Sequence, residues 1–166
     1  LRLDPGLAFG TGTHPTTRLC LEWLADRVPT DATVLDYGCG SGVLAIAALL
    51  LGAGSVEAVD NDPQALLAVA DNARNNGIVD GLSVCLPESA GQQTVDVVIA
   101  NILANTLIDL APRLLERLRP GGQLLLSGIL VQQAGAVQAA YGDACPLRVE
   151  AEQDGWVLLA GERARI

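Results

Sequence analysis

The sequence predicts an α/β domain with a Rossmann-like sheet of seven mostly parallel strands that closes with an antiparallel C-terminal pair. Three observations support this prediction. Strand-like apolar runs alternate with helix-like runs through the middle of the chain, as in a parallel sheet with crossover helices. The first strand leads into a loop with three glycines at alternate positions, Gly38, Gly40 and Gly42. The last two strand-like runs are separated only by a turn, which indicates an antiparallel ending.

The first seventeen residues are expected to form a loop, since residues 1–17 are rich in Gly, Pro and Thr and have no helical period. The apolar triplet 7–9 within this segment suggests that the loop packs on the domain as a lid. Thr16 or Thr17 is expected to cap the following amphipathic helix, which should end near Pro29.

The remaining elements follow from apolar patterns and from turn residues. Asp62 and Pro63 predict a helix start, with the carboxylate as cap and the proline in the first turn. Pro112 allows a kink or a late start in its helix. The strands are expected at 33–37, 55–60, 82–86, 95–101, 123–130, 147–152 and 156–161, the helices at 43–51, 62–76, 104–118 and 131–141, and the turns at 119–122 and 154–155.

The composition predicts one domain with an aliphatic core, since 166 residues suit a single domain and aromatic residues make up only 3% of them. The formal net charge of −9 argues against direct nucleic-acid binding and is compatible with a basic protein partner. No apolar run reaches the roughly eighteen residues that a membrane helix requires. We therefore expect no membrane partner.

The cysteines predict reduced thiols and a cytoplasmic protein without a metal site, because all four are far apart and form no C-x-x-C pair. No secretory signal segment opens the chain, which favours the same compartment. The sequence contains no Met, even at position 1, so we expect it to be a fragment of a longer chain.

The glycine loop is expected to hold a ligand at the carboxyl end of the first strand. A dinucleotide-binding loop would need its third glycine at Val43, but the third glycine comes earlier, at Gly42. Asp36 also stands directly before the loop, where a carboxylate would repel a pyrophosphate and attract a cation. The alternative is a tight strand–helix turn without a ligand.

Two strand ends supply further candidate residues. Asp60 follows the glycine loop by about twenty residues, which suits a carboxylate that binds ribose hydroxyls. Asn101 ends an apolar strand at the edge where ligands bind, and its oxygens could accept hydrogens from an amine. The alternatives are a helix-start residue for Asp60 and a turn former for Asn101. His14 is either a base or a packing and capping residue.

Three stretches resemble a known family. The pattern D-x-G-C-G-S-G at 36–42 resembles motif I of the class I S-adenosylmethionine methyltransferases. Together with segments 7–17 and 101–104, it resembles the PrmA family, which methylates the eleventh protein of the large ribosomal subunit. Asn-Ile-Leu-Ala at 101–104 is also similar to the Asn-Pro-Pro-Tyr motif of amino methyltransferases. The resemblance implies a cofactor-binding set of Phe9, Thr11, Thr13, Asp36, Gly38, Gly40, Gly42, Asp60, Asn61 and Asn101, with Asn101 also catalytic. The alternative for Phe9, Thr11 and Thr13 is a structural arm that covers the core. Glu88 follows the third strand and is a candidate adenine contact.

The resemblance implies a cytoplasmic protein N-methyltransferase that uses S-adenosyl-L-methionine. Its acceptors would be lysine and N-terminal amines of that large-subunit ribosomal protein. Residues 1–166 would be a single catalytic domain, and the N-terminal substrate-recognition domain of the family would be absent from this sequence. The alternatives are a methyltransferase for another protein or for a small-molecule amine, an NAD-dependent oxidoreductase, and a non-catalytic interaction domain.

Overall fold

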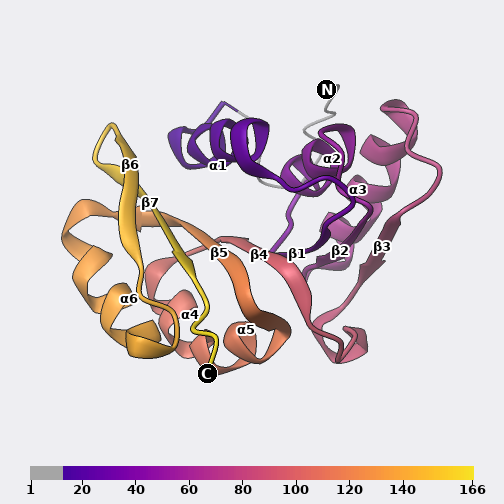
Figure 1. The fold of residues 1–166 in the computed structure, drawn as a ribbon. Helices are drawn as coiled ribbons and strands as arrows, with labels where there is room; N and C mark the ends of the chain where they lie inside the picture. The colour runs from indigo at the N-terminus through magenta and orange to yellow at the C-terminus, as the bar shows by residue number, and fades with distance from the viewer. Residues whose placement is uncertain (1–12) are drawn as a thin grey trace.

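A seven-stranded sheet forms the central layer of the computed structural model, which describes residues 13–166 (Figure 1). The strand order is β3-β2-β1-β4-β5-β7-β6. β1 to β5 are parallel, and β7 runs antiparallel to both β5 and β6, so the predicted fold class is confirmed. The strands are β1 (Thr33–Tyr37), β2 (Ser55–Val59), β3 (Leu82–Cys85), β4 (Val95–Asn101), β5 (Leu118–Leu130), β6 (Arg148–Gln153) and β7 (Trp156–Glu162).

Helices cover both faces of the sheet (Figure 1). One face carries α1 (Pro15–Arg27), α2 (Val43–Leu50) and α3 (Pro63–Asn75), and the other carries α4 (Ala104–Asp109), α5 (Ala111–Arg117) and α6 (Ala134–Tyr141). Three short 3₁₀ turns complete the described elements: η1 (Pro87–Ser89), η2 (Val131–Gln133) and η3 (Gly142–Ala144). Each face has its own cluster of buried apolar side chains. Burial on both faces explains why β4 is an almost continuous apolar run.

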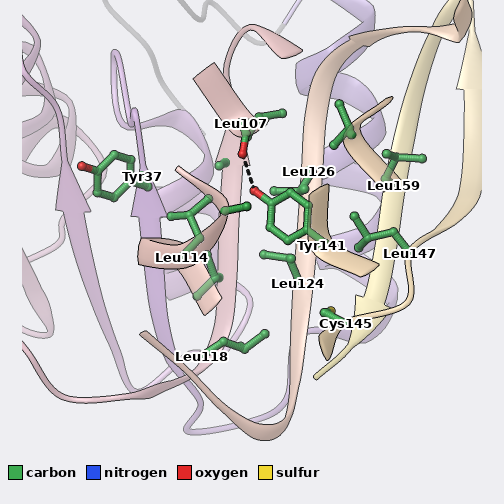
Figure 2. Close-up of a cluster of buried hydrophobic side chains, with 14 of the residues drawn as sticks. Tyr37, Leu107, Leu114, Leu118, Leu124, Leu126, Tyr141, Cys145, Leu147 and Leu159 are labelled. Carbon is green, nitrogen blue, oxygen red and sulfur yellow. Dashed lines mark hydrogen bonds between the residues drawn. The ribbon is translucent and has the colours of Figure 1, made fainter. Parts of the chain in front are cut away.

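The core beneath α4, α5 and α6 is mainly aliphatic, with leucine as its most frequent residue and Tyr141 as its largest fully buried side chain (Figure 2). The Tyr141 hydroxyl donates a hydrogen bond of 2.8 Å to the carbonyl oxygen of Leu107. This bond satisfies the one polar atom that Tyr141 brings into the core and ties α6 to α4.

The start of α1 differs from the prediction. The helix begins at Pro15, and its cap is His14, whose Nδ1 accepts a hydrogen bond of 3.2 Å from the Thr16 N–H. The prediction of Thr16 or Thr17 as cap is therefore wrong, and both side chains are buried in the first turn of α1. The expected loop 1–17 accordingly ends before Pro15, and its residues 1–12 lie outside the described part of the chain.

Two further segments differ from the prediction in the second half of the chain. The helix expected at 104–118 is divided at Leu110 into α4 and α5, as the possible kink at Pro112 indicated, because proline has no N–H for the helical ladder. The turn expected at 119–122 is wrong, since β5 already begins at Leu118 and pairs there with Val95 through an irregular register. The expected turn at 154–155 is confirmed, and Asp154 and Gly155 both have positive φ.

Candidate active site

A cavity of about 800 Å³ opens at the carboxyl ends of β1, β2 and β4. Parallel α/β sheets bind ligands at this edge. The loop after β1 lines the cavity with Gly38 and Gly40, β2 is followed by Asp60, and β4 ends in Asn101. The predicted strand-end residues therefore meet around one cavity. The lining also includes Thr16, Thr17, Asp36, Tyr37, Asn61, Pro87, Ile102, Leu103, Leu110 and Trp156.

The glycine loop bends back over the end of β2. Gly38 and Gly40 have φ values of 78° and 53°, in the left-handed region that side chains disfavour. The N–H groups of Gly38 and Cys39 both donate to the carbonyl oxygen of Val59, at 2.7 and 3.0 Å. The Gly40 N–H donates to Asp60 Oδ2 at 2.9 Å. These three backbone donors are thus already engaged within the protein.

Gly42 has a different role from the other two glycines. It is the N-cap of α2, with a φ of 82°, and it is not among the residues that line the cavity. A Cβ at this position would lie 2.8 Å from Cγ1 of Val69 on α3. The structure therefore places Gly42 in the close packing of α2 against α3. The prediction that Gly42 binds the cofactor is not supported, since this residue does not line the cavity.

Asp36 is the most deeply buried carboxylate at the cavity. Its side chain accepts a hydrogen bond of 3.1 Å from the Ala45 N–H. Burial raises the pKa of Asp36 to about 7, with the Asp60 charge as a smaller cause in the same direction and the Ala45 bond opposing them. A cation in the cavity would favour the ionised form, so this carboxylate suits a positively charged ligand.

Asp60 is held by two backbone donors. Its Oδ2 accepts from Gly40 N and its Oδ1 from Asp62 N, both at 2.9 Å. Asp62, as predicted, caps α3 through a bond of 2.9 Å from the Gln64 N–H. A carboxylate has about four acceptor positions, so Asp60 keeps capacity for hydroxyl donors in the cavity. The structural role of Asp60 is therefore compatible with the ligand-binding role that the sequence predicts.

Asn101 sits at the end of β4, where its Nδ2 donates to Thr17 Oγ1 on α1 at 3.4 Å. The next residue, Ile102, is enclosed by two glycines. A Cβ on Gly38 would lie 2.4 Å from Ile102 Cγ2, and one on Gly128 would lie 2.3 Å from the Ile102 carbonyl oxygen. Only glycine at both positions lets the segment after β4 approach the loop after β1 this closely.

His14 lines the cavity beside Trp156, with ring centroids 5.1 Å apart and ring planes at 69°. Nδ1 accepts from the Thr16 N–H and also lies 2.8 Å from Thr16 Oγ1, and a ring in which Nδ1 is the acceptor carries its proton on Nε2. A base at Nε2 would need the other tautomer, which breaks the cap. The structure therefore favours the capping alternative for His14.

Four other residues that were predicted to contact the cofactor either do not line the cavity or lie outside the described residues. Phe9 and Thr11 belong to residues 1–12, which the structure does not describe. Thr13 is exposed and directly precedes His14, and Glu88 is exposed in η1 while its neighbour Pro87 lines the cavity. Sequence reasoning missed Tyr37, Pro87, Leu110 and Trp156 as lining residues, since no local pattern separates them from core and turn residues.

Two further findings concern residues 13–166 alone. Within this range no three His, Cys, Asp or Glu side chains are grouped so that they could hold a metal ion. The helices of this range are all too short or too polar to cross a bilayer.

The sheet order, the reversed last strand and the cavity at β1, β2 and β4 define a Rossmann-like domain of the class I methyltransferase type. Residues 1–164 match the family described as "Ribosomal protein L11 methyltransferase (PrmA)". The chain therefore belongs to the PrmA family.

Relatives and solved structures agree with this assignment. A protein of Azotobacter vinelandii with the family's name is 57% identical over 98% of the chain, which spans only 56% of that relative. A crystal structure of a ribosomal protein L11 methylase from Lactobacillus delbrueckii is 38% identical, with a TM-score of 0.87, and the match covers 98% of this chain and 84% of that one. A 16S rRNA methyltransferase of T. thermophilus shares the fold, with a TM-score of 0.75 at 21% identity over 94% of this chain and 45% of that one.

Proposed function

We propose that this chain is the cofactor-binding and methyl-transferring part of an S-adenosyl-L-methionine-dependent protein N-methyltransferase. The observation that carries the proposal is the glycine loop, where the N–H groups of Gly38, Cys39 and Gly40 all donate within the protein. A pyrophosphate would need such donors free, so NAD is disfavoured. The same cavity contains the carboxylates of Asp36 and Asp60, which suit a cationic cofactor.

The residues fit S-adenosylmethionine in specific positions. Asp60 would accept hydrogen bonds from the ribose hydroxyls, and Gly38 lets the chain pass close to the ligand. The carboxylate of Asp36 would attract the positively charged methionine end of the cofactor. When bound, S-adenosylmethionine supplies a methyl group on a sulfonium sulfur, which is already activated for transfer.

The chain's own contribution to transfer would be orientation. Asn101 donates through Nδ2 to Thr17, so its planar amide directs Oδ1 elsewhere, and we infer that Oδ1 accepts a hydrogen from the acceptor amine. This contact would aim the lone pair of a neutral amine at the methyl carbon. We infer that water takes the amine proton, since Nδ1 of His14 is engaged by the Thr16 N–H.

Family membership supports ribosomal protein L11 as the acceptor. We infer that its lysine and N-terminal amines receive the methyl group, as the family resemblance implies. The net charge of −9 suits a basic protein partner. Because the chain spans about half the length of the curated relatives it matches, the acceptor is a proposal for this chain. Comparison of its turnover with that of the full-length Azotobacter vinelandii relative would test whether other parts of the protein deliver the acceptor.

Two measurements test the proposed function. Calorimetric titration with S-adenosylmethionine and with NAD should show binding of the first alone. Methylation of ribosomal protein L11 should rise with pH above neutrality, because lysine amines with a reference pKa of about 10.4 become neutral. Binding of NAD in place of S-adenosylmethionine would refute the proposal.

The catalytic assignment has its own test. Asn101→Ala should lower turnover by at least about tenfold, more than it weakens cofactor binding, because its bond to the amine would serve the transition state. Asn105→Ala, which removes an exposed amide on α4, is the matched control. Full turnover in the Asn101 variant would make Asn101 a strand-end residue without a catalytic role.

A further inference from the structure

The loop between β3 and β4 is held by charged side chains. Its first part, η1, brings Pro87 into the wall of the cavity. At its far end, Arg117 of α5 donates through Nε to the Gln93 carbonyl oxygen at 2.8 Å and through Nη2 to Glu57 Oε2 at 2.5 Å. Glu57 in turn accepts a bond of 2.7 Å from the Gly91 N–H. This end of the loop is therefore anchored to both α5 and β2.

Arg113 lies one turn before Arg117 on α5 and holds the other end of the loop. Its Nη2 donates to the Pro87 carbonyl oxygen at 2.6 Å. Its guanidinium carbon lies 5.6 Å from the centre of the Tyr37 ring, within the range of a cation–π contact. Tyr37 and Pro87 both line the cavity, so one guanidinium connects two parts of its wall.

The position of these residues in the sheet indicates which part of the ligand they face. The strands beneath the cavity follow the order β3-β2-β1-β4, with Pro87 just after β3, Asp60 after β2 and Asn101 at the end of β4. A ligand with its transferred group near Asn101 and its ribose at Asp60 extends its base toward Pro87. Tyr37, Pro87 and Leu110 supply apolar surface for a flat ring at this end.

We propose that Arg113 is a positioning residue for the nucleobase end of the cofactor site. It fixes Pro87 and Tyr37 relative to α5 and so keeps this wall formed before the cofactor binds. The assignment rests on the proposed function, because it takes the ligand to be an adenine nucleoside. Without the guanidinium, the cofactor would have to order the wall on binding, and its affinity would fall.

Calorimetry with S-adenosylhomocysteine tests the role of Arg113. Arg113→Ala and Arg113→Met should raise Kd about five- to tenfold, as expected for one charge-assisted bond and one cation–π contact at an exposed position, with unchanged stoichiometry. Arg113→Lys should recover part of the affinity, since an ammonium can donate to Pro87 and lie over Tyr37. Arg74→Ala is the control, because Arg74 is an exposed arginine on α3 paired with Asp71 of the same helix.

A second ligand separates positioning of the base from general damage to the fold. 5′-Methylthioadenosine keeps base and ribose but lacks the amino-acid end, so its Kd should rise by the same factor as that of S-adenosylhomocysteine. A purely structural role would instead lower the binding stoichiometry or the melting temperature and leave both Kd values unchanged.

Three results would overturn the assignment. The first is wild-type affinity in both Arg113→Ala and Arg113→Met, and the second is a loss restricted to S-adenosylhomocysteine. Either of these leaves the proposed function intact, because the wild-type chain still binds the cofactor. The third, a wild-type chain that binds neither ligand, overturns the proposed function and this assignment together.

Discussion

Replacement of Asp60 by alanine should weaken cofactor binding and should also loosen the glycine loop. Asp60 accepts from Gly40 N and Asp62 N, each at 2.9 Å, and in the proposed complex also from the ribose hydroxyls. Loss of hydrogen bonds to a charged group costs about 1.5–3 kcal/mol, which corresponds to roughly a 10- to 150-fold rise in Kd. The lost backbone bonds should lower the free energy of unfolding by about 1–2 kcal/mol as well.

A double cycle separates these two effects. Calorimetry would compare S-adenosylhomocysteine with its 2′,3′-dideoxy analogue in the wild type and in Asp60→Ala. If Asp60 binds the ribose, removal of the hydroxyls should weaken binding to the wild type and leave binding to the variant nearly unchanged. Asp26→Ala, which removes an exposed carboxylate on α1, controls for the change in net charge.

Two results would refute this reasoning about Asp60. One is an unchanged Kd in Asp60→Ala. The other is strict additivity, in which the loss of the hydroxyls weakens binding equally in wild type and variant. Additivity would mean that Asp60 only anchors Gly40 and that the ribose is bound by other groups.

Three further changes have outcomes that follow from burial and packing. Because burial raises the pKa of Asp36 from 3.8 to about 7, the folded state binds its proton more tightly, and the contribution of Asp36 to stability should fall by about 1 kcal/mol for each pH unit as pH rises between these values; chemical denaturation should show Asp36→Asn removing this contribution. Gly42→Ala should cost about 1–3 kcal/mol in the same assay, since its Cβ would meet Val69, while cofactor Kd stays unchanged. Tyr141→Phe should cost about 1–3 kcal/mol and lower the melting temperature, because the buried Leu107 carbonyl loses its 2.8 Å partner.

The sheet was predictable because its strands are marked by burial and by turn chemistry. Residues 97–100 are apolar because both faces of β4 are covered, and Asp62 with Pro63 caps α3 as the sequence indicated. Strand ends in a parallel sheet meet at one edge, so the meeting of Asp36, Asp60 and Asn101 at one cavity also follows from the pattern.

The errors arise where distant contacts decide local structure. Arg119-Pro120-Gly121-Gly122 has the composition of a turn, but pairing with β4 begins at Leu118 and draws this segment into β5. His14 rather than a threonine caps α1, and its ring is supported by Trp156 from the other end of the chain. Gly42 was predicted to belong to the ligand-binding loop. Its actual role depends on the contact with Val69, which follows from the packing of α3 and leaves no signal in the local sequence.

The placement of Ile102 between Gly38 and Gly128 packs the loop after β1, the segment after β4 and β5 against one another. Its side chain faces the loop after β1, while its backbone packs against Gly128 of β5 directly after Asn101. A larger residue at 102 would push against Gly38, and any side chain at 128 would displace the segment that follows Asn101. Under the proposed function, a change of acceptor is therefore best attempted at Leu103, which is 72% exposed at the cavity, while residues 38, 102 and 128 are kept together as one packed unit.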